Sequence, residues 1–137
     1  MVGQYEVALK AVLEDVVRRE AARVDQEGSF PRRSVDALRQ AGLLHLTVGA
    51  DVGGGGGDLG AARTVIEALA RVCGSTAMVT LMHYAAVAVL EAHGTPEDRR
   101  LLVQRGQLAT LAFSESGSRS HFWATQAPPS PGTGASS

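Results

Sequence analysis

The sequence has 137 residues, which is the length of one domain and leaves no room for a second one of full size. A hydrophobic fraction of 45% and a charged fraction of 20% are typical of a soluble globular chain and exclude a disordered one. Lysine and arginine together number 13 against 14 acidic residues, a formal charge of −1. This balance argues against a nucleic-acid-binding protein, which would carry a clustered basic excess.

The single cysteine and the first residues of the chain indicate the compartment. Cys73 cannot form an internal disulfide, which suits a reducing environment. The N-terminus has no basic region followed by an apolar stretch, so no signal peptide is recognised. We therefore expect a cytoplasmic protein.

One stretch, 73–90, has no charged residue and reaches the lower edge of membrane-spanning length. It contains polar residues such as Thr76, Thr80 and His83, and a helix that is apolar all round is common at the centre of a bundle. We predict a buried core helix here and no membrane contact.

Apolar spacing predicts two helices in the first third of the chain. The first has one apolar stripe between residues 5 and 24, and Gly28 ends it by adopting a positive φ. The second begins at Pro31, which needs no amide partner in a first turn, and ends at Gly42. The short apolar run 43–48 could then be extended.

Three more helices are expected in the middle of the chain. Five consecutive glycines, 53–57, exclude regular structure because each adds backbone entropy, so this segment is a loop. Helices follow over 59–73 and 76–92. The last helix begins at Thr95 as N-cap with Pro96 at its first position, and Gly106 ends it.

The end of the chain changes character. Residues 108–113 form a short apolar run that is interpreted as a strand, although such a run is ambiguous. Residues 124–137 carry no charge and consist almost entirely of Ala, Pro, Ser, Thr and Gly, so they should be disordered. The predicted fold is all-α: an up-and-down bundle of about five helices that ends in one strand and a disordered tail.

Candidate chemistry in the bundle is sparse. Residues 55–60 match the G-x-G-x-x-G dinucleotide fingerprint, but any polyglycine run does, and a second helix rather than a strand comes next, so a flexible surface loop is favoured. The four histidines lack the spacing of a helical metal site, so no metal is expected. His83 is interpreted as a neutral core or pocket-lining histidine.

The segment 113–123 is the most unusual part of the chain. It combines four serines, an acid, a histidine and two adjacent aromatic residues directly after the predicted strand. It lacks the G-x-S-x-G elbow of a nucleophilic serine. Two interpretations remain open: a polar turn, or a hydroxyl-rich loop that offers hydrogen bonds to a planar polar ligand.

The order of these motifs resembles the acyl-CoA dehydrogenase family, namely its N-terminal helical domain and the first strand and loop of its middle β domain. The resemblance covers about residues 5–123 and implies three parts: a helical domain over 1–107, a truncated β-domain start over 108–123 and a tail over 124–137. It rests on Phe-Pro at 30–31, residues 38–44, the glycine loop 53–60, residues 65–70, His-Gly-Thr-Pro-Glu at 93–97 and Leu-Ala-Phe-Ser-Glu-Ser-Gly at 111–117.

The resemblance implies an FAD-dependent oxidoreductase that oxidises the Cα–Cβ bond of an acyl-CoA thioester in fatty acid metabolism. By resemblance, the Ser114 hydroxyl meets the flavin ring, Leu111 and Phe113 add contacts from the same strand, and Ser120 approaches cofactor phosphate or the pantetheine. The acyl pocket would be lined by one helix face: Met78, Leu81, Met82 and Ala85. Full-length members of the family are expected to form homo-oligomers.

Departures from the family pattern leave alternatives. Ser116 replaces a proline and Leu111 replaces a tyrosine. Arg119 and His121 interrupt the usual A-G-S-D, and these two residues would suit the different substrate of a flavin-dependent monooxygenase of the same fold. A small cofactor-free helical interaction protein is the alternative from another class.

The family's catalytic carboxylate belongs to a C-terminal helical domain, and no acid in this sequence matches its context, so no catalytic residue is assigned. We accordingly expect a fragment that is inactive alone, and the tail composition suggests a frameshifted or truncated gene copy.

Overall fold

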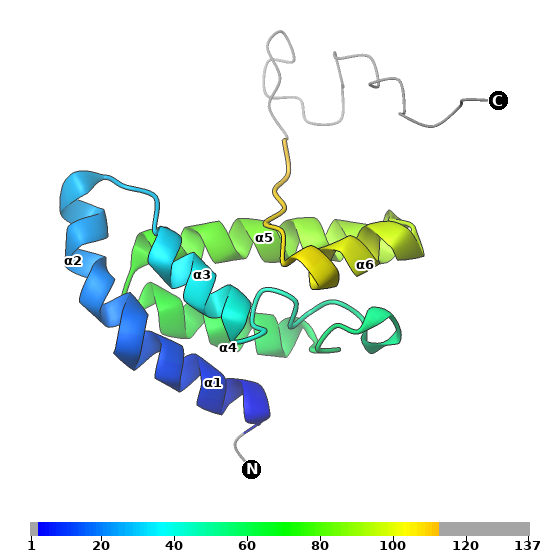
Figure 1. Cartoon of the computed structure of the whole chain (residues 1–137), viewed down its shortest axis with the longest axis horizontal. Coiled ribbons are helices and arrows are strands. Elements are labelled where there is room, and N and C mark those ends of the chain that lie inside the picture. The colour runs from blue at the N-terminus through cyan, green and yellow to red at the C-terminus, as the bar shows by residue number, and fades with distance from the viewer. Residues whose placement is uncertain (1–2, 113–137) are drawn as a thin grey trace, which may run out of the picture.

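This computed structural model describes residues 3–112 (Figure 1). They form five helices joined by turns and loops, and a wider turn interrupts the first helix. The first consists of α1 (Gln4–Val12), the π-helical turn η1 (Leu13–Val17) and α2 (Arg18–Glu27). The others are α3 (Arg32–Gln40), α4 (Leu59–Ala70), α5 (Gly74–His93) and α6 (Pro96–Arg105), with a short 3-10 turn, η2 (Ala50–Val52), before α4. The predicted all-α bundle is confirmed.

The helix ends follow the local chemistry read from the sequence. Gly28 ends α2 with a φ of 58° and Gly106 ends α6 with a φ of 54°, both in the left-handed region that glycine reaches without a steric penalty. The Thr95 hydroxyl accepts from the Asp98 amide at 3.2 Å, and the Asp98 carboxylate accepts from the Thr95 amide at 3.0 Å. This capping box satisfies amides that the first turn of α6 leaves free.

The wider turn η1 was not foreseen, and it explains how one face of the first helix stays buried. In a regular helix each residue turns about 100°. Leu9 and Val12 before η1, and Val17 and Val24 after it, would then be spread over about 140° of the helix surface. The residue that η1 inserts brings all four into the same core.

The centre of the bundle lies between α4 and α5, with α3 packed across them. Almost fully buried apolar side chains come from all three of these helices, from η1 and from the turns after α3; they include Leu38, Leu43, Leu69, Val17, Val35, Val65 and Val87. A smaller cluster of Val48, Val87 and Leu102 joins α5 to α6.

The run 43–48 is not extended; it forms consecutive turns. Gly42 has a φ of 75°, and the Leu43 amide donates to the Leu38 carbonyl at 2.9 Å, so the chain folds back directly after α3. Leu43, Leu44, Leu46 and Val48 are buried, and His45 and Thr47 between them are half-buried. The run is apolar because it fills the core, which an isolated two-sided strand would not do.

Two neighbouring side chains of α5 hold these turns. The Tyr84 hydroxyl donates to the Leu43 carbonyl at 2.6 Å, and His83 Nε2 lies 2.7 Å from the Leu44 carbonyl oxygen. The other ring nitrogen, Nδ1, accepts from the Ala109 amide at 3.0 Å. His83 is therefore a satisfied core histidine, as expected.

The glycine run is a loop, as predicted, but it is tied down rather than free. The amides of Gly55, Gly56 and Gly57 donate to the His45, Val48 and Leu46 carbonyls at 3.0, 2.8 and 2.8 Å. A Cβ at Gly55 would lie 2.7 Å from the Leu46 carbonyl oxygen, and one at Gly54 would meet the Val48 carbonyl even more closely. Glycine is needed because two backbone segments pack directly against each other.

After α6 the described chain continues as residues 106–112, which rise away from the helices in Figure 1. Residues 108–112, predicted as part of a strand, have no strand pairing, since residues 3–112 offer no neighbouring strand to bond them. Phe113 and the tail 124–137 lie outside the described residues. The boundaries drawn at 107 and 123 stay predictions.

Within the described residues one helix, α5, is long and apolar enough to cross a membrane by length and composition. A core helix of a bundle passes the same test, and α5 buries Thr76, Thr80 and His83 with partners inside the protein. These contacts favour the core helix that the sequence predicts.

Substituting Gly54 tests the packing of the glycine loop. We expect Gly54→Ala to lower the free energy of unfolding by about 1–3 kcal/mol, because the added methyl group overlaps the Val48 carbonyl. Urea denaturation measures the change. Gly74→Ala is the control, since a Cβ there meets nothing within 4 Å. Equal stability of the two variants would contradict the steric explanation.

Candidate functional site

A groove of about 810 Å³ runs between α4 and α5, and Thr47 and Gly57 line it beside the start of α4. On α4 the lining residues Leu59, Ala62 and Ile66 are three or four positions apart and so share one face of the helix. On α5 the lining residues Leu81, Ala85 and Ala88 share one face in the same way. Alanines at 62, 85, 88 and 92 leave the space between the two walls open because their side chains are short. The complete lining is Thr47, Gly57, Asp58, Leu59, Ala62, Arg63, Ile66, Glu67, Leu81, Tyr84, Ala85, Ala88, Glu91 and Ala92.

Large apolar side chains are exposed at and near the groove. Leu59 is 85% exposed at the start of α4, and Leu81 on α5 is also exposed. Met78 and Val89 extend this apolar surface along α5. Exposed apolar side chains beside a groove are typical of a surface that another molecule or another part of a protein covers.

The charged residues of the lining are already engaged. Asp58 caps α4 by accepting from the Ala61 amide at 2.9 Å. Glu67 pairs with Arg63 on the same helix at 3.0 Å. The interior of the groove is therefore apolar, and these charged side chains bind other groups of α4.

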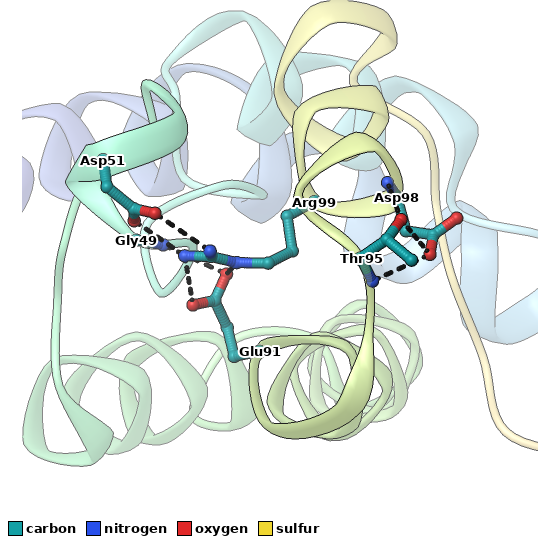
Figure 2. Close-up of polar contacts among 6 residues, drawn as sticks. All are labelled: Gly49, Asp51, Glu91, Thr95, Asp98 and Arg99. Carbon is teal, nitrogen blue, oxygen red and sulfur yellow. Dashed lines mark hydrogen bonds and ion pairs between the residues drawn. The ribbon is translucent and has the colours of Figure 1, made fainter.

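Glu91, at the α6 end of the groove, belongs to an ion-pair cluster around Arg99 (Figure 2). Arg99 Nε and one terminal nitrogen each lie 2.9 Å from a Glu91 oxygen, and its terminal nitrogens reach Asp51 at 2.7 and 2.9 Å. The Gly49 amide also donates to Glu91 at 3.2 Å. The cluster joins η2, the end of α5 and α6 into one unit.

This cluster keeps its carboxylates ionised. Hydrogen bonds from Arg99, and then the Gly49 amide, hold the pKa of Glu91 below its ordinary value against the opposing effect of desolvation. Hydrogen bonds from Arg99 lower the pKa of Asp51 in the same way. Because the pKa of Glu91 is lowered and both of its oxygens are bonded, Glu91 is a structural anchor and a poor proton acceptor.

The glycine loop cannot cradle a phosphate in this conformation. Phosphate loops bind through free backbone amides, whereas the Gly55, Gly56 and Gly57 amides are bonded to carbonyls of the preceding turns. The residues before the loop are turns and not a strand. The glycines that match the dinucleotide fingerprint at 55–60 are therefore explained by the close packing of the loop against the preceding turns, and not by phosphate binding.

The structure brings together only some of the predicted site residues. Leu81 and Ala85 line the groove, whereas the exposed Met78 and the half-buried Met82 lie beyond its lining. Leu111 is half-buried near the end of the described chain. Phe113, Ser114 and Ser120 lie outside the described residues, so their assignment stays a prediction.

The α4 wall and the small residues that open the groove were not predicted from the sequence. Ala85, Ala88 and Ala92 recur at helical spacing on α5, and Leu59, Ala62 and Ile66 do so on α4. This pattern is visible in the sequence, but it does not reveal that the two faces oppose each other. Among residues 3–112 no group of three or more His, Cys, Asp or Glu side chains could hold a metal ion.

Comparison with known proteins gives a consistent picture. The family described as "Acyl-CoA dehydrogenase, N-terminal domain" matches residues 4–105. A short-chain-specific acyl-CoA dehydrogenase of Clostridium acetobutylicum is 31% identical over 88 residues, or 64% of this chain and 23% of the relative. A probable acyl-CoA dehydrogenase of Mycobacterium leprae is 30% identical over 117 residues, or 82% and 30% of the two chains.

A relative with another activity has a similar identity to this chain. The dibenzothiophene monooxygenase of Mycolicibacterium goodii is 31% identical over 109 residues, covering 77% of this chain and 26% of its own. The chain therefore spans less than a third of the length of these relatives. No solved structure gives a significant match.

The Arg99 cluster can be tested by comparing two arginines. We expect Arg99→Leu to lower the urea midpoint markedly, because Glu91 and Asp51 lose their shared partner, while Arg63→Leu removes one exposed pair with little effect. Circular dichroism during urea titration measures both. A loss that is no larger for Arg99→Leu than for Arg63→Leu would show that the cluster does not secure this end of the groove.

Proposed function

Because the chain belongs to the acyl-CoA dehydrogenase family, with its N-terminal domain over residues 4–105, we propose that it forms one wall of an acyl-CoA site in an FAD-dependent oxidoreductase. The reaction proposed is oxidation of the Cα–Cβ bond of an acyl-CoA thioester. The observation that carries this proposal is the apolar groove between α4 and α5.

The groove suits an acyl chain. Its volume lies within the range of small-molecule sites, and its interior is built from Leu, Ile and Ala side chains. A fatty acyl chain needs only apolar contact, worth about 0.8 kcal/mol for each buried CH₂ group. Leu81 and Ala85 are the predicted pocket residues that support this assignment, and Ile66, Ala62 and Ala88 extend it.

The catalytic base is proposed to come from outside residues 3–112. Each of the three carboxylates in the groove, Asp58, Glu67 and Glu91, already accepts a hydrogen bond or ion pair within the bundle. A base must be free to take a proton from the substrate. We therefore propose that this chain is inactive alone, as predicted from its sequence.

The flavin contacts are proposed for the segment that leaves the bundle. Residues 3–112 do not by themselves fit a dinucleotide, because the glycine amides are bonded internally and the groove is apolar. When bound, FAD supplies the hydride acceptor. The residues proposed to contact it are Leu111, Phe113, Ser114 and Ser120, of which only Leu111 lies in the described part of the chain.

Two alternatives are kept because specific observations favour them. Similarity to a dibenzothiophene monooxygenase supports a flavin-dependent oxygenation on the same fold. The exposed apolar residues Leu59, Met78 and Leu81 support a helical interaction protein without a cofactor.

A cytoplasmic location and homo-oligomeric assembly are proposed together with the enzyme function. Retention of FAD on purification favours the flavoenzymes, and flavin indifference with tight self-association favours the interaction protein.

Binding of acyl-CoAs tests the groove directly. We expect the full chain to bind octanoyl-CoA more tightly than butyryl-CoA, and Ala88→Trp to weaken octanoyl-CoA binding at least tenfold by filling the groove. Isothermal titration calorimetry measures both.

The control is Ala11→Trp, an exposed position on α1 outside the groove lining, which should bind like the unmodified chain. Equal affinity for CoA alone and for both acyl-CoAs would rule out an acyl groove. Equal weakening by the two tryptophan variants would place the binding site elsewhere.

A further inference from the structure

We propose that His83 is a positioning residue: its neutral imidazole joins the Leu44 carbonyl to the Ala109 amide and so fixes the course of residues 106–112. This inference rests on the proposed function, because the segment leads to the residues proposed to contact the flavin. His83 itself is 1% exposed and does not line the groove.

The hydrogen bonds define a single tautomer. A carbonyl oxygen only accepts, so Nε2, 2.7 Å from the Leu44 oxygen, must carry the proton. A backbone amide only donates, so Nδ1, 3.0 Å from the Ala109 nitrogen, must be unprotonated. Both ring nitrogens are used, and no other protonation state of the ring satisfies both partners.

A second contact fixes the segment three residues earlier. Arg39 Nε donates to the Gly106 carbonyl at 2.7 Å, and Gly106 is buried with a φ of 54°. The segment is therefore attached to α3 at Gly106 and to α5 at Ala109. Figure 1 shows it leaving the helices from this region. Leu111 lies two residues beyond the second attachment.

The surroundings of His83 favour the neutral ring. The charged and titratable groups that face it are Arg39 on α3, His45 in the turns after α3, and its neighbour Tyr84, whose ring centroid lies 6.0 Å away. Burial, the largest effect, lowers the pKa of His83 below its usual value, against a smaller opposing effect of the Leu44 carbonyl; His45 and Arg39 lower it further by smaller amounts. The neutral ring is thus the form present in the folded protein at neutral pH.

Protonation should release the segment. A proton on Nδ1 would place two N–H groups opposite each other and remove the acceptor for Ala109. Because the folded pKa is lowered, the contact is complete above about pH 6.5, the ordinary value for histidine, and is lost only as the pH falls through the lower folded pKa.

Hydrogen exchange in the full chain tests this without any cofactor. We expect His83→Leu to reduce the protection of the Ala109 amide at least tenfold while the Val87 amide in α5 stays protected. His83→Gln, which keeps a donor and an acceptor, should restore part of this protection. His93→Leu, at an exposed position on the same helix, should change neither amide. Unchanged Ala109 protection in His83→Leu, or a loss that Val87 shares fully, would overturn the inference.

The unmodified protein supplies a second, independent measurement in case His83→Leu fails to fold. Imidazole ¹⁵N chemical shifts at pH 7 should identify the tautomer with the proton on Nε2, and the Ala109 protection factor should fall on acidification together with the titration of His83. A proton on Nδ1 at pH 7 would overturn the inference.

Flavin binding separates this inference from the proposed function. We expect FAD affinity to fall at least threefold in His83→Leu and to recover in His83→Gln. If the unmodified chain binds FAD and both variants bind it equally well, the positioning role is wrong and the proposed function stands. If the unmodified chain binds no FAD, the proposed flavin function is wrong, and the role of His83 toward the flavin is wrong with it.

Discussion

The structure depends on two adjacent side chains of α5 that bond the backbone of a distant turn. Tyr84 and His83 donate to the consecutive carbonyls of Leu43 and Leu44, and both side chains are buried. Buried carbonyls without partners are costly, so a chain that turns inside the core needs such donors. These two bonds let the apolar turns 43–48 occupy the core, and the turns in turn provide the carbonyls to which the glycine loop is attached.

Much of the fold follows from local sequence signals. Gly28, Thr95, Pro96 and Gly106 act where their own chemistry requires, so the helix ends they define were predictable. The turns at 43–48 were not, because an apolar run has the same composition in a strand as in a buried turn. The contacts with His83 and Tyr84, some forty residues later, help to decide between the two, and these contacts are tertiary.

The site shows the same division. Resemblance to a family selected one face of α5, and Leu81 and Ala85 of that face do line the groove. The opposing wall on α4 could not be assigned, since residue spacing gives a helix face but not its neighbour. His83 could be identified as a buried neutral histidine, whereas its two backbone partners, Leu44 and Ala109, depend on packing.

The π-helical turn η1 has a consequence for how the first helix accommodates changes in chain length. It absorbs one extra residue between Leu13 and Val17 without disturbing the helical residues on either side. A related chain one residue shorter in this stretch could present the same buried face through an unbroken α-helix. An alignment gap within 13–17 would then mark a local change in winding and leave the remaining helices in register.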